Sequence, residues 1–194
     1  MKLCDLHLKF STDKGTKHSY IDQYDELFDD IKNDKLNVME IGVLFGGSLK
    51  MWETYFTNSQ IYGMEDFSQE TGQSYYNNKP VIAEDVIKSL EEHKRITLFN
   101  ISCEDIEKVE AITSGIDFNV VIDDASHNPD QQRLNMSTFL KKISKGGIYI
   151  CEDVRTDSIA EGLVELAKEL MPECDAFYKR WEKKRDDRMV IVKL

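Results

Sequence analysis

The sequence has no long apolar run and contains few prolines and cysteines. No stretch approaches the roughly 20 apolar residues of a membrane-spanning helix, and the charged N-terminus has no signal-peptide core. We therefore expect no membrane association and a cytoplasmic location. Only 3 prolines occur, which argues against a disordered chain. The cysteines stand singly, without a C-x-x-C pair, so a zinc or dithiol site is not expected; they are Cys4, Cys103, Cys151 and Cys174.

Positive charge is also scarce. The chain has 25 Lys and Arg against 36 Asp and Glu, for a formal net charge of −11. Proteins that bind nucleic acid duplexes or anionic membranes need a basic surface, so we expect neither as a partner. A length of 194 residues suits one domain. We predict a single domain over residues 1–194, with a lid segment and helix at 1–36 and a core at 37–194.

Short apolar runs alternate with helical patterns along the chain. The runs are almost free of charge, as expected for strands buried on both faces. The predicted strands are Val38–Val43, Gln60–Met64, Ile96–Phe99, Phe118–Ile122 and Ile148–Cys151. The predicted helices are Tyr20–Ile31, Ser48–Phe56, Ala83–His93, Glu104–Thr113, Pro129–Ile143 and Ser158–Leu170. The pair Gly146-Gly147 is expected to end the helix that precedes the fifth strand.

The C-terminal part has a different pattern. Two strand-like runs, Cys174–Trp181 and Arg188–Leu194, flank a charged run and predict a hairpin. The strand–helix alternation before them predicts right-handed crossovers and helices on both faces of a parallel sheet. The predicted fold class is therefore α/β, with a doubly wound, mostly parallel seven-stranded sheet and a C-terminal antiparallel hairpin.

A glycine-rich turn follows the first predicted strand. Gly42 and Gly46 allow the backbone to approach a ligand closely before the next helix begins. The second strand ends at Glu65-Asp66, where an acid typically accepts hydrogen bonds from ribose hydroxyls. Together these features favour a nucleoside-containing cofactor over a turn without a ligand. The sequence lacks G-x-G-x-x-G and G-K-[ST], which argues against a dehydrogenase and a P-loop site.

Acidic residues also follow the fourth and fifth strands. The fourth ends in Asp123-Asp124 with His127 close behind, and the fifth ends in Glu152-Asp153. Adjacent carboxylates after a buried strand repel each other unless they bind something. Asp124, Glu152 and Asp153 would form an oxygen-rich site for Mg²⁺ or Mn²⁺, with His127 beside it as general base. The alternative is that these residues cap helices or face solvent.

Four motifs together resemble a known enzyme family. They are T-D-K-G-T-x-H-S-Y, M-E-I-G-V-x-x-G-G-S-L-x-M-W, I-D-D-A-S-H and I-Y-I-C-E-D, in that order, between about Ser11 and Asp153. The set resembles the class I S-adenosylmethionine-dependent methyltransferases, with their Rossmann-like fold. Within that class it is similar to the metal-dependent macrolide and rhamnosyl sugar O-methyltransferases, the mycinamicin and macrocin group. This chain is expected to lack their N-terminal auxiliary domain.

The resemblance implies roles for individual residues. Asp124, Glu152 and Asp153 match the Mg²⁺ ligands of the family, and His127 matches its catalytic base, with Asp124 beside it. The cofactor-binding residues that we expect, from the resemblance and from the turns, are Thr12, His18, Tyr20, Glu40, Gly42, Gly46, Glu65, Asp66, Ser102 and Asp123.

The expected function is transfer of a methyl group from S-adenosylmethionine to a hydroxyl, assisted by Mg²⁺ or Mn²⁺. The expected acceptor is a small molecule, either a sugar or a nucleotide-linked sugar, and a homo-oligomer is one possible state. A catechol-like diol is an alternative acceptor, because the same metal chemistry serves it. A non-catalytic nucleoside-binding module of the same fold is the alternative from a different class.

Overall fold

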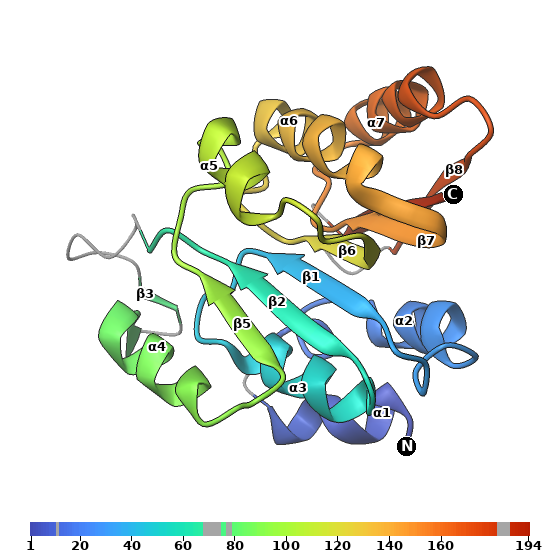
Figure 1. Ribbon diagram of the computed structural model, residues 1–194. Helices are drawn as coiled ribbons and strands as arrows, with labels where there is room; N and C mark the ends of the chain where they lie inside the picture. Colours follow the sequence, from blue (N-terminus) through green and yellow to red (C-terminus); the bar gives the residue numbers. More distant parts are fainter. Residues whose placement is uncertain (11, 68–74, 77–78, 182–186) are drawn as a thin grey trace.

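A seven-stranded sheet forms the centre of the molecule (Figure 1). The computed structural model describes residues 1–10, 12–67, 75–76, 79–181 and 187–194. The strand order in the sheet is β5-β2-β1-β6-β7-β9-β8. These strands are β1 (Asn37–Ile41), β2 (Gln60–Met64), β5 (Ile96–Phe99), β6 (Phe118–Asp123), β7 (Ile143–Cys151), β8 (Asp175–Arg180) and β9 (Arg188–Lys193).

The pairing directions confirm the predicted fold class. β1 pairs in parallel with both β2 and β6, and parallel pairing continues to β5 on one side and β7 on the other. β9 runs antiparallel to β7, and β8 runs antiparallel to β9. Strand order therefore reverses at β1 and β6, and ligands of open α/β sheets bind beyond the carboxyl ends of strands at such a point.

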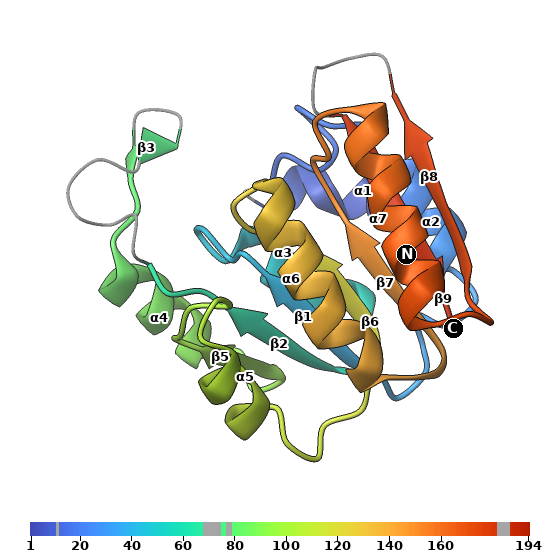
Figure 2. The ribbon, with the colours of Figure 1, turned by 90° about the horizontal axis from the view of Figure 1, so that it is seen from above.

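Helices cover both faces of the sheet (Figures 1 and 2). The strands expose alternate side chains to each layer; on β6, Val120 and Ile122 pack into one core and Val121 into the other. One layer contains α1 (Leu3–Leu6), the short 3₁₀ helix η1 (His7–Lys9), α2 (Ile21–Phe28), α3 (Gly47–Tyr55) and α4 (Ala83–Glu91). The other contains α5 (Ile106–Ile112), α6 (Pro129–Phe139), η3 (Leu140–Lys142) and α7 (Asp157–Leu170).

The prediction for the Gly146-Gly147 pair is wrong. The α-helix α6 ends at Phe139 and the short η3 at Lys142, and both glycines lie inside β7, where the register with β6 shifts. Gly146 has a φ of +82°, and a Cβ on Gly147 would lie 2.8 Å from the carbonyl oxygen of Asn119. The glycines therefore allow an irregularity in the pairing of β7 with β6 and do not end a helix.

A second sheet, of two short strands, is separate from the central one. The short strands β3 (Tyr75–Tyr76) and β4 (Lys79–Pro80) pair antiparallel, which the sequence did not indicate, and Figure 2 shows β3 away from the main body. Of the charged run between β8 and β9, only Asp187 is described. Ser11, which directly precedes the first motif, is also outside the described residues.

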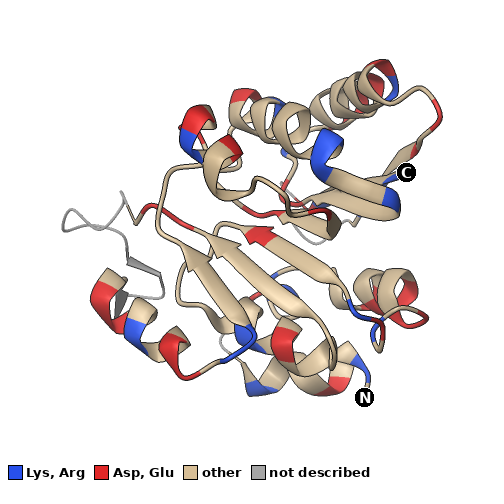
Figure 3. Ribbon diagram, in the orientation of Figure 1, with Lys and Arg blue, Asp and Glu red and all other residues tan. Residues whose placement is uncertain are grey.

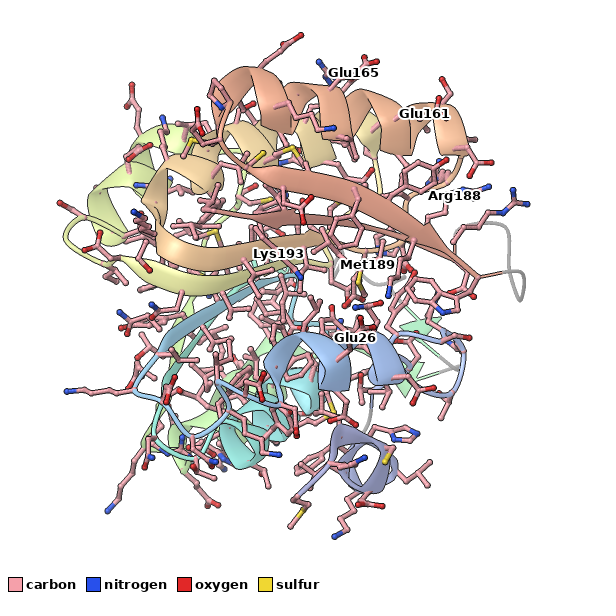
Figure 4. The ribbon with its side chains drawn as sticks, turned by 90° about the vertical axis from the view of Figure 1, so that its right-hand side faces the viewer. Glu26, Glu161, Glu165, Arg188, Met189 and Lys193 are labelled. Atoms are coloured by element: carbon pink, nitrogen blue, oxygen red, sulfur yellow. The ribbon has the colours of Figure 1, made fainter. Side chains whose placement is uncertain are left out.

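The hairpin is fastened to both helical layers. In Figure 4, Glu26 of α2 faces the hairpin strands, and Arg188 lies near one end of β9. The Glu26 carboxylate lies 3.0 Å from the ammonium of Lys179 on β8. In the other layer, Asp157 at the start of α7 accepts a 2.7 Å hydrogen bond from Arg188 Nε. These contacts join β8 to α2, near the other end of the chain, and β9 to α7.

Charge is concentrated outside the strands. Figure 3 shows acidic and basic residues mainly on the helices, and further acidic residues at the ends of the central strands. Within the described residues, no helix has both the length and the apolar character needed to cross a membrane. The acidic strand ends direct attention to the edge of the sheet where the strand order reverses.

Candidate active site

A cavity of about 510 Å³ opens beyond the carboxyl ends of the strands. Four successive loops contribute to its wall, after β1, β2, β5 and β6, and the segment before α2 contributes Thr12 and Asp13. The loops supply residues 42–45, 65–67, 101–104 and 124–127. The cavity therefore occupies the position in which open α/β sheets bind their ligands.

The turn after β1 is locked against the turn after β6. Gly42 has a φ of +91°, and a Cβ there would lie 2.1 Å from the backbone oxygen of Asp124. The Glu65 carboxylate accepts hydrogen bonds from the backbone N–H groups of Val43 and Leu44, at 3.0 and 3.2 Å. The acid after β2 therefore also shapes the glycine-rich turn, and glycine at position 42 allows the two turns to touch.

Two carboxylates and an imidazole meet at the cavity wall. Ligand atoms of Asp124, His127 and Asp153 all lie within 4.8 Å of one another. His127 Nε2 lies 3.3 Å from Asp124 Oδ1 and 3.3 Å from Asp153 Oδ2. Two carboxylates suit a hard divalent cation such as Mg²⁺ or Mn²⁺. We call these three residues the metal group; their donor set fits such an ion.

A buried lysine lies directly behind this group. The Lys14 side chain is 1% exposed, and its Nζ donates hydrogen bonds to Asp124 Oδ2 at 2.7 Å and to Glu152 Oε2 at 2.8 Å. It also lies 3.2 Å from Glu40 Oε1. Tyr24 OH donates to the other oxygen of Glu152. Lys14 thus joins the ends of β1, β6 and β7 through their acidic residues.

The segment between Lys14 and α2 also reaches the metal group. Tyr20 is fully buried, and its hydroxyl donates a 2.5 Å hydrogen bond to Asp153 Oδ1. His18 Nδ1 lies 3.2 Å from the same oxygen and 3.6 Å from Oδ1 of the buried Asp187. The polar segment expected to form a lid is therefore anchored in the acidic cluster.

Burial and neighbouring charge act differently on these acids. Burial alone would raise the pKa of Asp124, but the Lys14 ammonium and His127 outweigh it and lower that pKa to about 2. Burial raises the pKa of Glu152, although Lys14 opposes the shift. Burial likewise raises the pKa of Asp153, reinforced by the charge of Asp124. Asp124 is therefore the acid of this cluster whose ionised form is most strongly favoured.

Unusual backbone conformations gather at the cavity. Among the described residues other than glycine, a positive φ occurs at Leu44, Phe67, His127 and Asp153, with values between +50° and +54°. All four line the cavity. Side chains with a Cβ adopt this region at a cost, and such residues cluster at functional sites. Two of the four belong to the metal group.

The structure brings most, but not all, of the predicted site residues to the cavity. Those that line it are Thr12, Gly42, Glu65, Asp66, Ser102, Asp124, His127 and Asp153. Six others do not line it: His18, Tyr20, Glu40, Gly46, Asp123 and Glu152.

Glu40 and Asp123 show why some of these residues lie outside the cavity. Glu40 lies behind the glycine-rich turn, where Ser48 Oγ donates a 2.6 Å hydrogen bond to it. Asp123 points to the opposite face of the sheet, because side chains alternate along β6. There it accepts hydrogen bonds from Asn135 Nδ2 and Tyr149 OH at 2.9 and 3.0 Å. Asp123 is therefore a core residue rather than a cavity residue in this structure, and its burial raises its pKa to about 6.

Lys14 and Tyr24 are the important residues that the sequence did not reveal. Lys14 lies in a polar, turn-forming motif, and Tyr24 on an amphipathic helix face, so each has an ordinary explanation. The surplus of acids at neighbouring strand ends was the one signal, because buried carboxylates need compensating charge. That signal does not indicate which of the many lysines supplies it.

The sequence is similar to several O-methyltransferases of actinobacteria. It is 29% identical to mycinamicin VI 2''-O-methyltransferase of Micromonospora griseorubida, over 79% of this chain and 36% of that protein. It is also 29% identical to demethylmacrocin O-methyltransferase of Streptomyces fradiae, with the same coverage. The chain thus spans about a third of the length of these relatives. No protein-family model matches the chain.

Solved structures show the same fold. The MycE methyltransferase of the mycinamycin pathway, in complex with Mg, S-adenosylhomocysteine and mycinamycin VI, superposes with a TM-score of 0.73. The match has 22% identity and covers 100% of this chain and 54% of that one. A fibrillarin pre-rRNA processing protein of Methanococcus jannaschii is more distant, with a TM-score of 0.61 and 14% identity over 84% of this chain and 67% of that one. The chain therefore has the class I methyltransferase fold, and its sequence is similar to the mycinamicin and macrocin O-methyltransferases in the part of those enzymes that it covers.

Proposed function

We propose that this chain transfers a methyl group from S-adenosylmethionine to a hydroxyl of a sugar-containing small molecule, with a divalent cation as cofactor. The observation that carries the proposal is one cavity whose wall contains both the glycine-rich turn at Gly42 and the metal group Asp124, His127 and Asp153. Relatives named as rhamnosyl-tetracenomycin and olivosyl-oleandolide O-methyltransferases support the sugar-containing acceptor class.

The cofactor would lie along the loops after β1, β2 and β5. Gly42 gives it close access to the backbone, and the Asp66 and Glu65 carboxylates lie where ribose hydroxyls are usually bound. Ser102, after β5, is proposed on the adenine side. These residues position the donor at the cavity end that leads to the metal group.

Asp124 and Asp153 would hold the divalent cation. When bound, such an ion supplies positive charge that lowers the pKa of an acceptor hydroxyl and fixes its orientation. The two carboxylates face the cavity together with His127, while Glu152 is bonded to Lys14 and Tyr24. Glu152 therefore acts on the metal group through Lys14, which it shares with Asp124.

His127 would remove the proton from the acceptor hydroxyl. Its Nε2 lies 3.3 Å from a carboxylate oxygen of Asp124 and from one of Asp153, and these negative charges would stabilise the imidazolium that forms when the ring takes up the proton. The side chain is 32% exposed, so it can meet an acceptor in the cavity. Positioning of donor and acceptor would supply most of the rate, since the sulfonium donor is already activated.

The test measures methyl transfer by mass spectrometry to a panel of sugars, nucleotide-linked sugars and catechols, with Mg²⁺ and with EDTA. We expect product with sugar-containing acceptors and a loss of at least about 100-fold with EDTA, His127→Ala or Asp124→Asn. Asp130→Asn is the matched control, because Asp130 is an exposed acid near His127 on the first turn of α6. It should keep wild-type activity.

Each other result has a definite meaning. Undiminished activity with EDTA and with His127→Ala would exclude the metal–histidine mechanism. Product from catechols alone would show that the acceptor is a catechol-like diol and not a sugar. Binding of S-adenosylmethionine without product from any acceptor would favour a non-catalytic module of the same fold.

A further inference from the structure

Lys14 has more acidic partners than any ordinary ion pair requires. Its ammonium contacts three carboxylates at the ends of three strands. They belong to Glu40, the penultimate residue of β1, Asp124 directly after β6, and Glu152 directly after β7. The nitrogen–oxygen distances lie between 2.7 and 3.2 Å. The lysine is 1% exposed, whereas the nearby Lys17 is 38% exposed. The ammonium is therefore held as an internal ion by the strands of the sheet.

The cluster contains enough negative charge to require such an ion. With Asp153, four acids lie at three neighbouring strand ends, and Glu40, Glu152 and Asp153 are all buried. Charge repulsion and lost hydration would destabilise them without compensation. Carboxylate oxygens arranged around one centre are also what a divalent cation seeks. The position of the Lys14 ammonium is thus one that a metal ion would otherwise favour.

The acids divide into two halves that share Asp124. One oxygen of Asp124 contacts Lys14 together with Glu152, on the buried side. Its other oxygen contacts His127, which also contacts Asp153, at the cavity. Glu152 does not belong to the metal group. The ammonium and a divalent ion can therefore be accommodated on opposite oxygens of one carboxylate.

We propose that Lys14 is a built-in cation that fills the buried half of the carboxylate cluster and leaves room for one divalent ion at the carboxylates of Asp124 and Asp153, beside His127. This inference rests on the metal site of the proposed function. In this proposal, Glu40 and Glu152 bind the lysine ammonium and not the metal. The ammonium would then compensate the charge of the acids at the strand ends, so that the protein stays folded when no metal is bound.

Lys14→Met tests the proposal, because it removes the charge and retains most of the side-chain length. Mn²⁺ is titrated calorimetrically into wild type and variant, and thermal unfolding is followed with EDTA and with Mg²⁺. We expect one Mn²⁺ per wild-type chain. The variant should bind Mn²⁺ at least tenfold more tightly or take up a second ion, and it should unfold at a lower temperature in EDTA, with Mg²⁺ restoring more of the loss than it adds to wild type.

Two further variants make the result decisive. Lys17→Met, on the same segment, should behave as wild type in every assay. If Lys14→Met does not fold, Lys14→Met combined with Glu152→Gln removes one charge of each sign. The double variant should fold in EDTA and bind one Mn²⁺; if it also fails to fold, the proposal is wrong.

The outcomes separate this inference from the proposed function. Equal or weaker Mn²⁺ binding by Lys14→Met would overturn the built-in cation while leaving the metal site intact. Binding by Lys14→Met but not by wild type would show that Lys14 leaves no room for a divalent ion, and it would contradict both this proposal and the metal-assisted mechanism. Absence of binding to both proteins would contradict both.

Discussion

Gly42 is the residue at which the cofactor turn meets the metal group. A Cβ there would lie 2.1 Å from the Asp124 carbonyl oxygen, and the backbone has a φ of +91°. We expect Gly42→Ala to lower the free energy of unfolding by roughly 3–5 kcal/mol, because strain and a clash with rigid backbone add together. It should also weaken S-adenosylhomocysteine binding. Urea denaturation and calorimetry measure the two effects.

Gly115→Ala is the matched control for that change. Gly115 has a φ of +76°, but nothing lies within 4 Å of the position of its Cβ. Its substitution should cost only the backbone strain, roughly 1–2 kcal/mol, and leave cofactor binding unchanged. Similar losses of stability in the two variants would show that the contact between Gly42 and Asp124 does not constrain the site.

At the scale of single elements, α1 depends on a side chain from α2. Asp25 accepts hydrogen bonds from the backbone N–H groups of Leu3 and Cys4, at 2.9 and 3.4 Å, so it satisfies the free donors of the first turn of α1. Leu3 and Leu6 are buried against the core. The position of α1, and through it the start of the segment that carries Lys14, therefore rests on this carboxylate.

Asp25→Ala should release α1 while leaving the sheet intact. Loss of such a capping interaction costs about 1 kcal/mol. We expect amide hydrogen exchange of residues 3–6 to become roughly fivefold faster, while exchange in β1 is unchanged. Asp22→Ala, an exposed acid on the same helix, is the control and should exchange as wild type. Equal amide exchange of residues 3–6 in both variants would contradict the conclusion that Asp25 holds α1 in place.

The parallel strands of the central sheet were accessible from sequence because each contains a short apolar run that is almost free of charge. The bounds of β2 and β5 agree with the prediction. The start of β7 does not, because Ser144 and Lys145 interrupt its apolar pattern and the two glycines resemble a helix end. Local pattern reveals burial on both faces but cannot reveal a strand irregularity that depends on a neighbouring strand.

At the scale of the whole molecule, the donor and metal regions share a cavity but use different residues. Saturating S-adenosylhomocysteine, at about 100 times its dissociation constant, should stabilise the fold by about 2.7 kcal/mol, or roughly 5–10 °C for a chain of this size. We expect the same shift in EDTA and with Asp124→Asn. Thermal unfolding measures it; a shift that needs Mg²⁺ would instead show that the metal group completes the donor site.

The candidate site could be predicted only in part, because some of its contacts follow from the sheet topology and others depend on details of strand ends and loops. Sequence order places Asp124 and Asp153 at the same edge of the sheet, so their meeting with His127 at one cavity follows from topology. Successive side chains of a strand point to opposite faces of the sheet, so a shift of one residue changes the face on which an acid lies. Asp123 points away from the cavity for that reason. The arrival of Lys14 at strand ends more than a hundred residues away depends on a loop path that no local pattern encodes.

The strand order has a consequence for synthesis of the chain. β9 is made after β8, yet it pairs between β7 and β8. A nascent chain that has emerged only as far as β8 therefore leaves the β7 edge without its neighbour, and such an open edge invites pairing with other chains. Released chains that end between residues 180 and 188 should therefore depend on chaperones, whereas chains that include β9 should not.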